Sequence, residues 1–173
     1  FLSQSFRMIA PYWGDFDTRN LSSGVVYYKL SSSALIIQWD HCGYYDSLAD
    51  KTNTFQLILT DGIDQLLDAG KNVSFCYRDM QWTTGSASGG SGGFGGNPAT
   101  VGINKGDSIS SIQIGRYDQP GLVYNGPYGG PAGIDMLDNQ SYSFGLCDTS
   151  NFAPFLKYSE LCDTLEICLG DTA

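Results

Sequence analysis

The sequence predicts an all-β fold, an antiparallel β-sandwich with Gly-rich loops and little helix. Eight or nine short runs of β-branched, aromatic and aliphatic residues alternate with turn signals, which is typical of strands joined by tight turns. The 22 glycines and the aromatic content of 13% agree with this pattern. A β-barrel is the second choice, and no internal repeat at a fixed period is visible.

The central element of the predicted fold is a pair of strands between residues 53 and 82. The stretch 54–60 is rich in β-branched, aromatic and aliphatic residues, which suit a strand. Asp61-Gly62 supplies a turn signal, and the chain returns as a second strand over 73–77. We therefore expect these two strands to pair at the heart of the domain.

Other strands are expected on both sides of this pair. Their residue ranges are 1–9, 24–30, 34–39, 109–114, 121–124, 141–147 and 165–169. Apolar and polar residues alternate over 109–114, which indicates a half-buried strand. The polar stretch 41–52 and the glycine-rich stretch 85–96 are interpreted as loops. The glycine-rich loop is expected to be ordered, because it carries Phe94.

A chain of 173 residues is long enough for one domain with its own core. We expect a β domain over residues 1–147 and a cysteine-bearing C-terminal extension over 148–173 that docks on it. No window holds the roughly 18 apolar residues that a membrane-spanning helix needs, so no membrane insertion is expected. The chain starts at Phe1 rather than Met, which suggests a mature product or an excised piece of a longer protein.

The charge of the chain is strongly acidic. There are 18 acidic residues against 9 basic ones, which gives a net charge of −9. The phosphates of DNA, RNA or an anionic membrane would be repelled by this charge, so none of them is expected as a partner. The same charge fits a solvated surface or the binding of a cation.

The cysteines and the glycosylation sequons favour a secreted protein. Five cysteines show no CxxC spacing and only one histidine is present, which argues against a zinc site. Asn20, Asn72 and Asn139 each begin an Asn-x-Ser sequon. Together with the cysteines, these sequons indicate an oxidising, extracellular environment, either secreted or at the cell surface.

One disulfide bond can be argued from the predicted strands. Cys42 and Cys76 lie in or beside predicted strands of one sheet, so we expect a bridge between them. Two of the remaining three cysteines, Cys147, Cys162 and Cys168, can pair with each other. The third would then pair outside this chain or remain a buried thiol.

Asp15 and Asp17 are the candidate metal ligands. In extended backbone, residues two apart lie on the same face, so the two carboxylates can share a hard cation such as Ca²⁺. Ca²⁺ is the only cofactor that the sequence suggests, and further oxygens would have to come from Asp61 or Asp107. The alternative is structural: one carboxylate pairs with Arg19 and the other accepts backbone N–H hydrogen bonds in a turn.

Aromatic residues in predicted loops are the candidate contacts for a partner. Exposed aromatic rings anchor protein interfaces and stack on sugars. The candidates are Tyr44, Tyr45, Tyr124 and Tyr128. The three tryptophans, Trp13, Trp39 and Trp82, are expected to fill the core instead.

No catalytic residues are predicted. A Ser-His-Asp or Cys-His arrangement would have to use His41, the only histidine, which we expect to be an exposed loop residue. A glycosidase needs two carboxyl groups at a defined separation on either side of a sugar ring. Asp15 and Asp17 would have to supply that pair, and an enzyme ranks third, after a protein-binding module and a carbohydrate-binding module.

Several of these motifs, taken in order, resemble the NIDO domain, the nidogen-like extracellular module. The matching runs are Tyr12 to Arg19, Gly24 to Tyr28, Asn53 to Gly62, Phe75 to Tyr77, Gln81 to Gly85 and the glycine-rich 93–102. The series covers about residues 9–147. The chain departs from the family pattern in Cys42 and Cys76, in its closing strand at 141–146 and in the tail after Cys147.

The resemblance implies a non-catalytic module within a larger multidomain protein. Domains of this kind are found in extracellular matrix and cell-surface proteins, so the expected function is adhesion or matrix assembly through binding of other extracellular proteins. The alternative is a Ca²⁺-assisted carbohydrate-binding, lectin-like module that uses the Asp15–Asp17 pair and the tyrosines, with glycans as partners.

Overall fold

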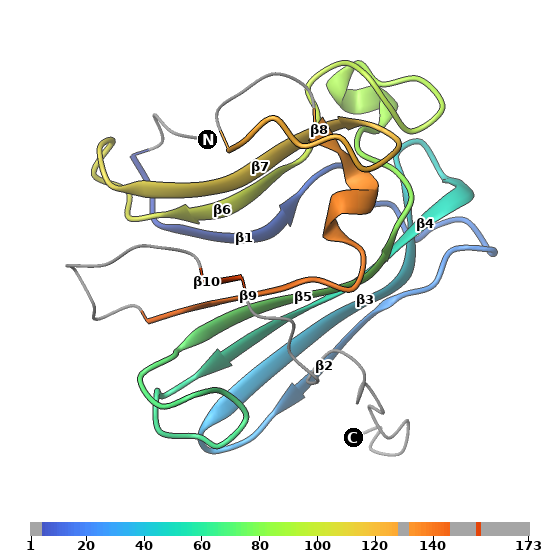
Figure 1. Ribbon diagram of the computed structural model, residues 1–173. Coiled ribbons are helices and arrows are strands. Elements are labelled where there is room, and N and C mark those ends of the chain that lie inside the picture. The colour runs from blue at the N-terminus through green and yellow to red at the C-terminus, as the bar shows by residue number, and fades with distance from the viewer. Residues whose placement is uncertain (1–4, 128–131, 146–154, 157–173) are drawn as a thin grey trace.

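The protein is a two-layer β-sandwich (Figure 1), seen in a computed structural model that describes residues 5–127, 132–145 and 155–156. One sheet has four strands in the order β1-β6-β7-β8, and the other has six in the order β10-β9-β5-β4-β3-β2. All neighbouring strands pair antiparallel except β7 and β8, which run parallel. This confirms the predicted all-β, mainly antiparallel sandwich.

The four-stranded sheet is made of β1 (Met8–Trp13), β6 (Thr100–Asn104), β7 (Ser111–Gln119) and β8 (Ala132–Gly133). The six-stranded sheet is made of β2 (Val26–Leu30), β3 (Ala34–Tyr44), β4 (Leu48–Thr60), β5 (Val73–Met80), β9 (Ser141–Phe144) and β10 (Phe155–Leu156). Two short 3₁₀ helices, η1 (Ser86–Ser88) and η2 (Ile134–Leu137), complete the described elements. The predicted central pair is present as β4 and β5, whose register places Leu57 opposite Phe75.

Several strand predictions needed correction. Strand β1 continues to Trp13, whereas the predicted first strand ended at residue 9. The polar stretch 41–52 is largely strand, because β3 and β4 extend toward each other and leave only a short turn at 45–47. Strand β6 was missed; it begins at Thr100, shortly after the glycine-rich run ends at Gly96. The predicted edge strand 121–124 is irregular, and its Val123 carbonyl accepts a hydrogen bond from Gly133 N–H. The predicted strand 165–169 lies outside the described residues.

An aromatic core fills the space between the two sheets. Trp82 is fully buried, and its ring lies 4.8 Å from Phe16 and 5.4 Å from Tyr44 between centroids. Trp39 stacks on Phe55 at 4.7 Å and is only partly buried. The prediction for the tryptophans therefore holds for Trp82 and, in part, Trp39. It is wrong for Trp13, which is 45% exposed at the end of the edge strand β1.

The predicted Cys42–Cys76 bridge is not formed. Cys42 lies on β3 and is a free, buried thiol, whereas Cys76 lies on β5. Strand β4 runs between these two strands, which places them two strand spacings, or about 10 Å, apart. A disulfide needs Cα atoms within about 7 Å, so residues on β3 and β5 are too far apart for one. Sharing a sheet is therefore not enough to predict a bridge.

No helix within the described parts of the chain is long and apolar enough to cross a membrane.

Candidate interaction surface

Three segments that are far apart in the sequence meet at one end of the sandwich. They are the segment after β1, the turn between β3 and β4, and the glycine-rich segment after β5. Tyr45 N–H donates to the Asp15 carbonyl at 2.9 Å, and Ser86 N–H donates to the Tyr45 carbonyl at 3.0 Å. The Ser88 hydroxyl donates to Asp15 Oδ1 at 2.8 Å. The β3–β4 turn is therefore held on both sides by backbone hydrogen bonds.

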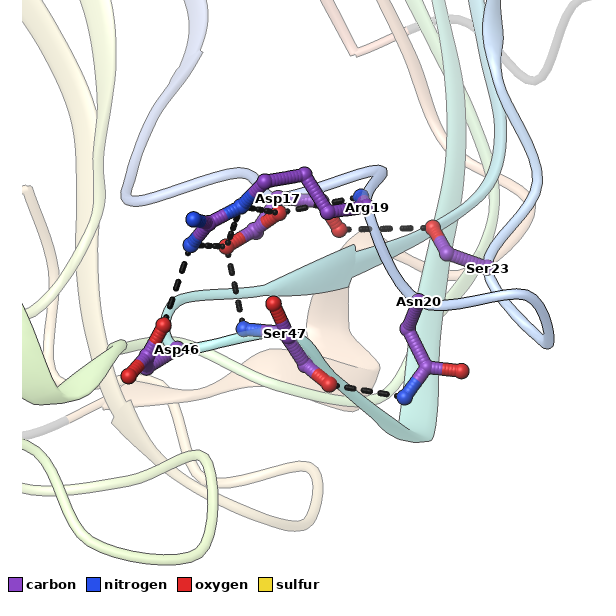
Figure 2. A network of polar contacts seen from close by, with 6 residues as sticks. All are labelled: Asp17, Arg19, Asn20, Ser23, Asp46 and Ser47. Atoms are coloured by element: carbon purple, nitrogen blue, oxygen red, sulfur yellow. Dashed lines mark hydrogen bonds and ion pairs between the residues drawn. The ribbon is translucent and has the colours of Figure 1, made fainter.

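Asp17 is the hub of a polar network at this end (Figure 2). Its carboxylate is buried and accepts two hydrogen bonds from the Arg19 guanidinium Nε, at 2.9 and 3.0 Å, and one from the Arg19 backbone N–H at 3.0 Å. Ser47 N–H donates to Asp17 Oδ2 at 2.9 Å. On the same turn, the Ser47 carbonyl accepts from the Asn20 side-chain amide at 2.7 Å. One carboxylate thus ties the segment after β1 to the turn.

The outward side of this network presents an arginine, a tyrosine and an aspartate. The Arg19 side chain is 62% exposed, and its guanidinium carbon lies 5.7 Å from the centroid of the Tyr45 ring. Arg19 Nη2 also pairs with Asp46 Oδ1 at 3.0 Å. The carboxylates of Asp17 and Asp46 both pair with the Arg19 guanidinium and so fix its direction. We call Arg19, Tyr45 and Asp46 the loop patch.

The ion pair sets the electrostatics of the loop patch. Hydrogen bonds from the Arg19 guanidinium hold the pKa of the Asp17 carboxyl well below its usual range, and Asp17 raises the pKa of Arg19 in turn. The carboxylate therefore stays charged through the acidic range in which exposed aspartates protonate. Because Asp17 is charged, the guanidinium keeps its position.

The Asp17→Asn variant is expected to unfold a few degrees below the wild type at pH 7, about 2–4 °C. A carboxyl whose pKa is lowered on folding adds stability above its unfolded pKa, near 4, and loses it as the pH falls through the folded value. The gap between the two melting temperatures should therefore close from about pH 4 downward. Thermal unfolding followed by circular dichroism from pH 7 to pH 2 measures this, and a gap that stays constant with pH would contradict it.

The proposed cation pair, Asp15 and Asp17, matches the structural alternative in part, because Asp17 pairs with Arg19 whereas Asp15 accepts from a serine hydroxyl of another segment rather than from backbone N–H groups. Asp17 is neutralised by Arg19, and Asp15 accepts a hydrogen bond from Ser88 through Oδ1 while Oδ2 is buried without a partner. Asp61 and Asp107, suggested as further ligands, instead accept backbone N–H groups within their own turns. Within residues 5–127, 132–145 and 155–156, no group of three or more His, Cys, Asp or Glu side chains is placed to hold a metal.

The glycine-rich segment is ordered, as predicted, and contacts Asp15 and the backbone of Tyr45. A Cβ atom on Gly85 would lie 2.8 Å from the Asp15 Cβ and 2.9 Å from the Tyr45 carbonyl oxygen, so only glycine fits there. The N–H groups of Thr83 and Thr84 both donate to the Gly93 carbonyl, at 2.7 and 3.0 Å. The backbone of this segment is thus fixed close to the turn.

The tyrosines predicted to contact a partner fall in different places. Tyr45 is 40% exposed and belongs to the loop patch. The prediction is wrong for Tyr44, which is 2% exposed and donates its hydroxyl to Asp50 at 2.7 Å, because strand alternation turns it into the core. Tyr124 is 41% exposed and donates to the Ile114 carbonyl at 2.5 Å. Tyr128 lies outside the described residues.

Two of the residues in this surface were not singled out from the sequence. Asp46 and Ser47 belong to the stretch interpreted as a polar loop, and only their position after the Tyr44-Tyr45 pair hinted at a role. His41 is exposed, as predicted, but it lies within β3 rather than in a loop. Of the sequon asparagines, Asn139 is exposed in a turn, and Asn20 and Asn72 are partly buried.

Comparisons with known proteins agree with the sequence motifs. A family model described as a nidogen-like domain, NIDO, matches residues 29–143. The chain is 27% identical over 154 residues to dendrite extension defective protein 1 of Caenorhabditis elegans, with 74% of this chain and 12% of that protein covered. It is 28% identical over 151 residues to alpha-tectorin of Gallus gallus, with 70% of this chain and 7% of that protein covered. The chain thus spans a small part of both relatives, and no solved structure matches it significantly.

Proposed function

Since the chain belongs to the NIDO family of nidogen-like domains, we propose that it is a non-catalytic extracellular module that binds partner proteins in matrix or cell-surface adhesion. The family is found in proteins of the extracellular matrix type, and the two relatives are much longer than this chain. We place the module in a larger multidomain protein on that ground. Its role there is to supply one binding surface among several.

The loop patch is the observation that carries this proposal. Arginine and tyrosine are among the residues that contribute most to binding at protein interfaces. Here the guanidinium is fixed against the Tyr45 ring by two carboxylates, so little side-chain entropy remains to be lost on binding. Backbone hydrogen bonds from both sides hold the turn itself. A surface that is ordered before binding and rich in such residues suits recognition of a protein.

The Tyr45→Ala variant tests this assignment. The chain, multimerised on beads, would be applied to matrix laid down by cultured cells, with and without prior digestion of the matrix by protease. We expect protease-sensitive binding that Tyr45→Ala weakens at least about 30-fold, as for an interface residue worth about 2 kcal/mol. Tyr28→Ala is the matched control, because Tyr28 is 77% exposed on β2, away from the loop patch.

Each outcome of that experiment has a definite meaning. Loss of binding in Tyr45→Ala with binding kept in Tyr28→Ala supports the loop patch. The reverse pattern would keep the function but move the interface to the free edge of β2. Binding that resists protease but is lost after removal of glycans, or in EDTA, would replace the proposal with the carbohydrate-binding alternative. No binding to any matrix would contradict the proposed function.

Asn139 is the sequon asparagine that we propose to carry a glycan. It is exposed and adopts a left-handed backbone conformation, with φ of 57°, in the turn before β9. Asn20, in contrast, uses its side-chain amide to hold the turn next to the loop patch. A glycan on Asn139 would leave the loop patch network intact, which is compatible with a secreted binding module.

A further inference from the structure

Strand β2 forms one edge of the six-stranded sheet, and no strand in the described part of the chain pairs with its free side (Figure 1). It pairs with β3 in one unbroken register, from Val26 opposite Trp39 to Leu30 opposite Leu35. The strand contains no proline and no β-bulge, and Lys29 is its only charged residue. Folded proteins usually protect an exposed edge with charged residues, prolines, bulges or a covering element. The edge of β2 has a single charge of this kind, so another strand can pair with it.

The hydrogen bonds between β2 and β3 show which backbone groups of β2 point to the free side. At one end of this ladder, Ser31 N–H donates to the Ala34 carbonyl at 2.9 Å. At the other end, Asp40 N–H donates to the Val25 carbonyl at 3.1 Å. Every second residue of an antiparallel strand bonds to the same neighbour, and Val25 and Ser31 both belong to the set that bonds to β3. The other residues direct N–H and C=O away from β3, and they are Val26, Tyr28 and Leu30.

The side chains of these three residues form an exposed apolar row. Val26 is 45% exposed, Tyr28 77% and Leu30 70%. Trp39 and Ile37 of β3 lie opposite the first two, and both pack against the core between the sheets. Since directly opposite residues share a face, the row lies on the core-facing side of the six-stranded sheet. A strand added to this edge would place its own side chains against the row.

We propose that two copies of this chain associate through β2, antiparallel and about a twofold axis at Tyr28, so that their six-stranded sheets join. In this register Tyr28 lies opposite Tyr28 of the second copy, and Val26 lies opposite Leu30 of the second copy. Each of these pairs exchanges both backbone hydrogen bonds, so every outward N–H and C=O of the three residues finds a partner. A shift of the register by two residues would leave one of the three opposite a residue outside β2.

The side chains of β2 favour a second copy over an unrelated strand. On the core-facing side, apolar residues of one copy meet apolar residues of the other. On the opposite side, Lys29 lies opposite Tyr27 of the second copy, so no two like charges face each other directly. The chain carries a net charge of −9, but no acidic residue lies within β2. The strand is thus complementary to itself, as an interface about a twofold axis requires.

Sedimentation velocity of the purified full chain in a reductant, at concentrations from about 1 to about 300 μM, tests the dimer. We expect the wild type to shift from monomer to dimer within this range. Tyr28→Lys and Tyr28→Glu each place two like charges at the axis and remove the pair of rings, so each should weaken association at least about 10-fold. An equimolar mixture of the two variants places Lys opposite Glu and should associate at least about 5-fold more tightly than either variant alone.

Controls separate this register from general effects of charge. Leu30 lies opposite Val26 of the second copy, so a mixture of Leu30→Lys and Leu30→Glu should associate no more tightly than its components. Ile109→Lys, at a residue 87% exposed between β6 and β7, should leave association unchanged. A wild type that stays monomeric over the whole range, or a Tyr28 mixture that gains nothing over its components, would overturn the proposal. Rescue in the Leu30 mixture instead would overturn the axis at Tyr28.

This inference goes beyond the proposed function, since it concerns the edge of β2 and not the loop patch. The matrix assay presents the chain already multimerised on beads, so loss of the β2 dimer leaves its Tyr28→Ala control valid. Sedimentation uses the purified chain without matrix, so the dimer and the loop patch can each fail without the other.

Discussion

Replacing Trp82 with alanine is expected to lower the free energy of unfolding by about 3–5 kcal/mol, because it truncates the largest fully buried side chain of the core. The indole contacts the rings of Tyr12, Phe16 and Tyr44. Truncation leaves a cavity that these rings cannot fill without leaving their own neighbours. It also removes the Nε1–H donor to the Cys42 carbonyl, at 3.0 Å, and so leaves a buried acceptor unpaired.

Urea unfolding at equilibrium measures this effect, with Trp13→Ala as the matched control. Trp13 is the same residue type but is 45% exposed, so its truncation should cost less than about 1 kcal/mol. Equal losses for the two tryptophans would show that burial between the sheets does not set the energetics of the core. A loss below about 1 kcal/mol for Trp82→Ala would have the same meaning.

The class of the fold was predictable because strand periodicity is a local property. The 54–60 and 73–77 stretches carry their own alternation and turn, and both became central strands. The run at 100–104 also contains β-branched residues, but it was not predicted as a strand because glycines lie before and within it. Strand β6 is stabilised by pairing with β1 and β7 on either side, which residues nearby in the sequence do not reveal.

The site was predictable only in part, because it depends on where a turn begins. Tyr44 and Tyr45 are adjacent, and a polar loop would have exposed both. Since β3 continues to Tyr44, alternation sends this ring into the core and leaves Tyr45 outside. An ion pair between Arg19 and either Asp15 or Asp17 was the structural alternative that the sequence offered, and Asp17 forms it. Its contact with Ser47, 30 residues away, arises from the tertiary fold and has no counterpart in the sequence pattern.

A buried polar residue on β4 holds the start of the glycine-rich segment that borders the β3–β4 turn. Asn53 is fully buried on β4, and its Oδ1 accepts from Gln81 N–H at 2.7 Å and Trp82 N–H at 3.1 Å. Its Nδ2 donates to the Trp82 carbonyl at 3.0 Å. These bonds fix the chain where it leaves β5 and enters the glycine-rich segment. Asn53 therefore connects the stability of the core to the order of the surface.

Asn53→Leu keeps the approximate size of the side chain and is expected to cost about 3 kcal/mol. The buried N–H group of Trp82 and the partly buried N–H group of Gln81 would lose their acceptor, and a buried unpaired group costs about 1–3 kcal/mol. Tyr12→Phe is the control, since it removes the other donor to the Trp82 carbonyl, at 2.6 Å, while the Asn53 amide remains there. Its cost should be about 1 kcal/mol.

Hydrogen exchange distinguishes this effect from a general loss of stability. In Asn53→Leu the amides of Thr83 and Thr84, which bond to Gly93, should exchange faster than the change in global stability predicts, because the anchor of the segment is lost. In Tyr12→Phe they should follow the global change alone. If these amides follow global stability in both variants, Asn53 stabilises the core without ordering the segment. The order of the loop patch would then depend on Asp17 and the β3–β4 turn rather than on Asn53.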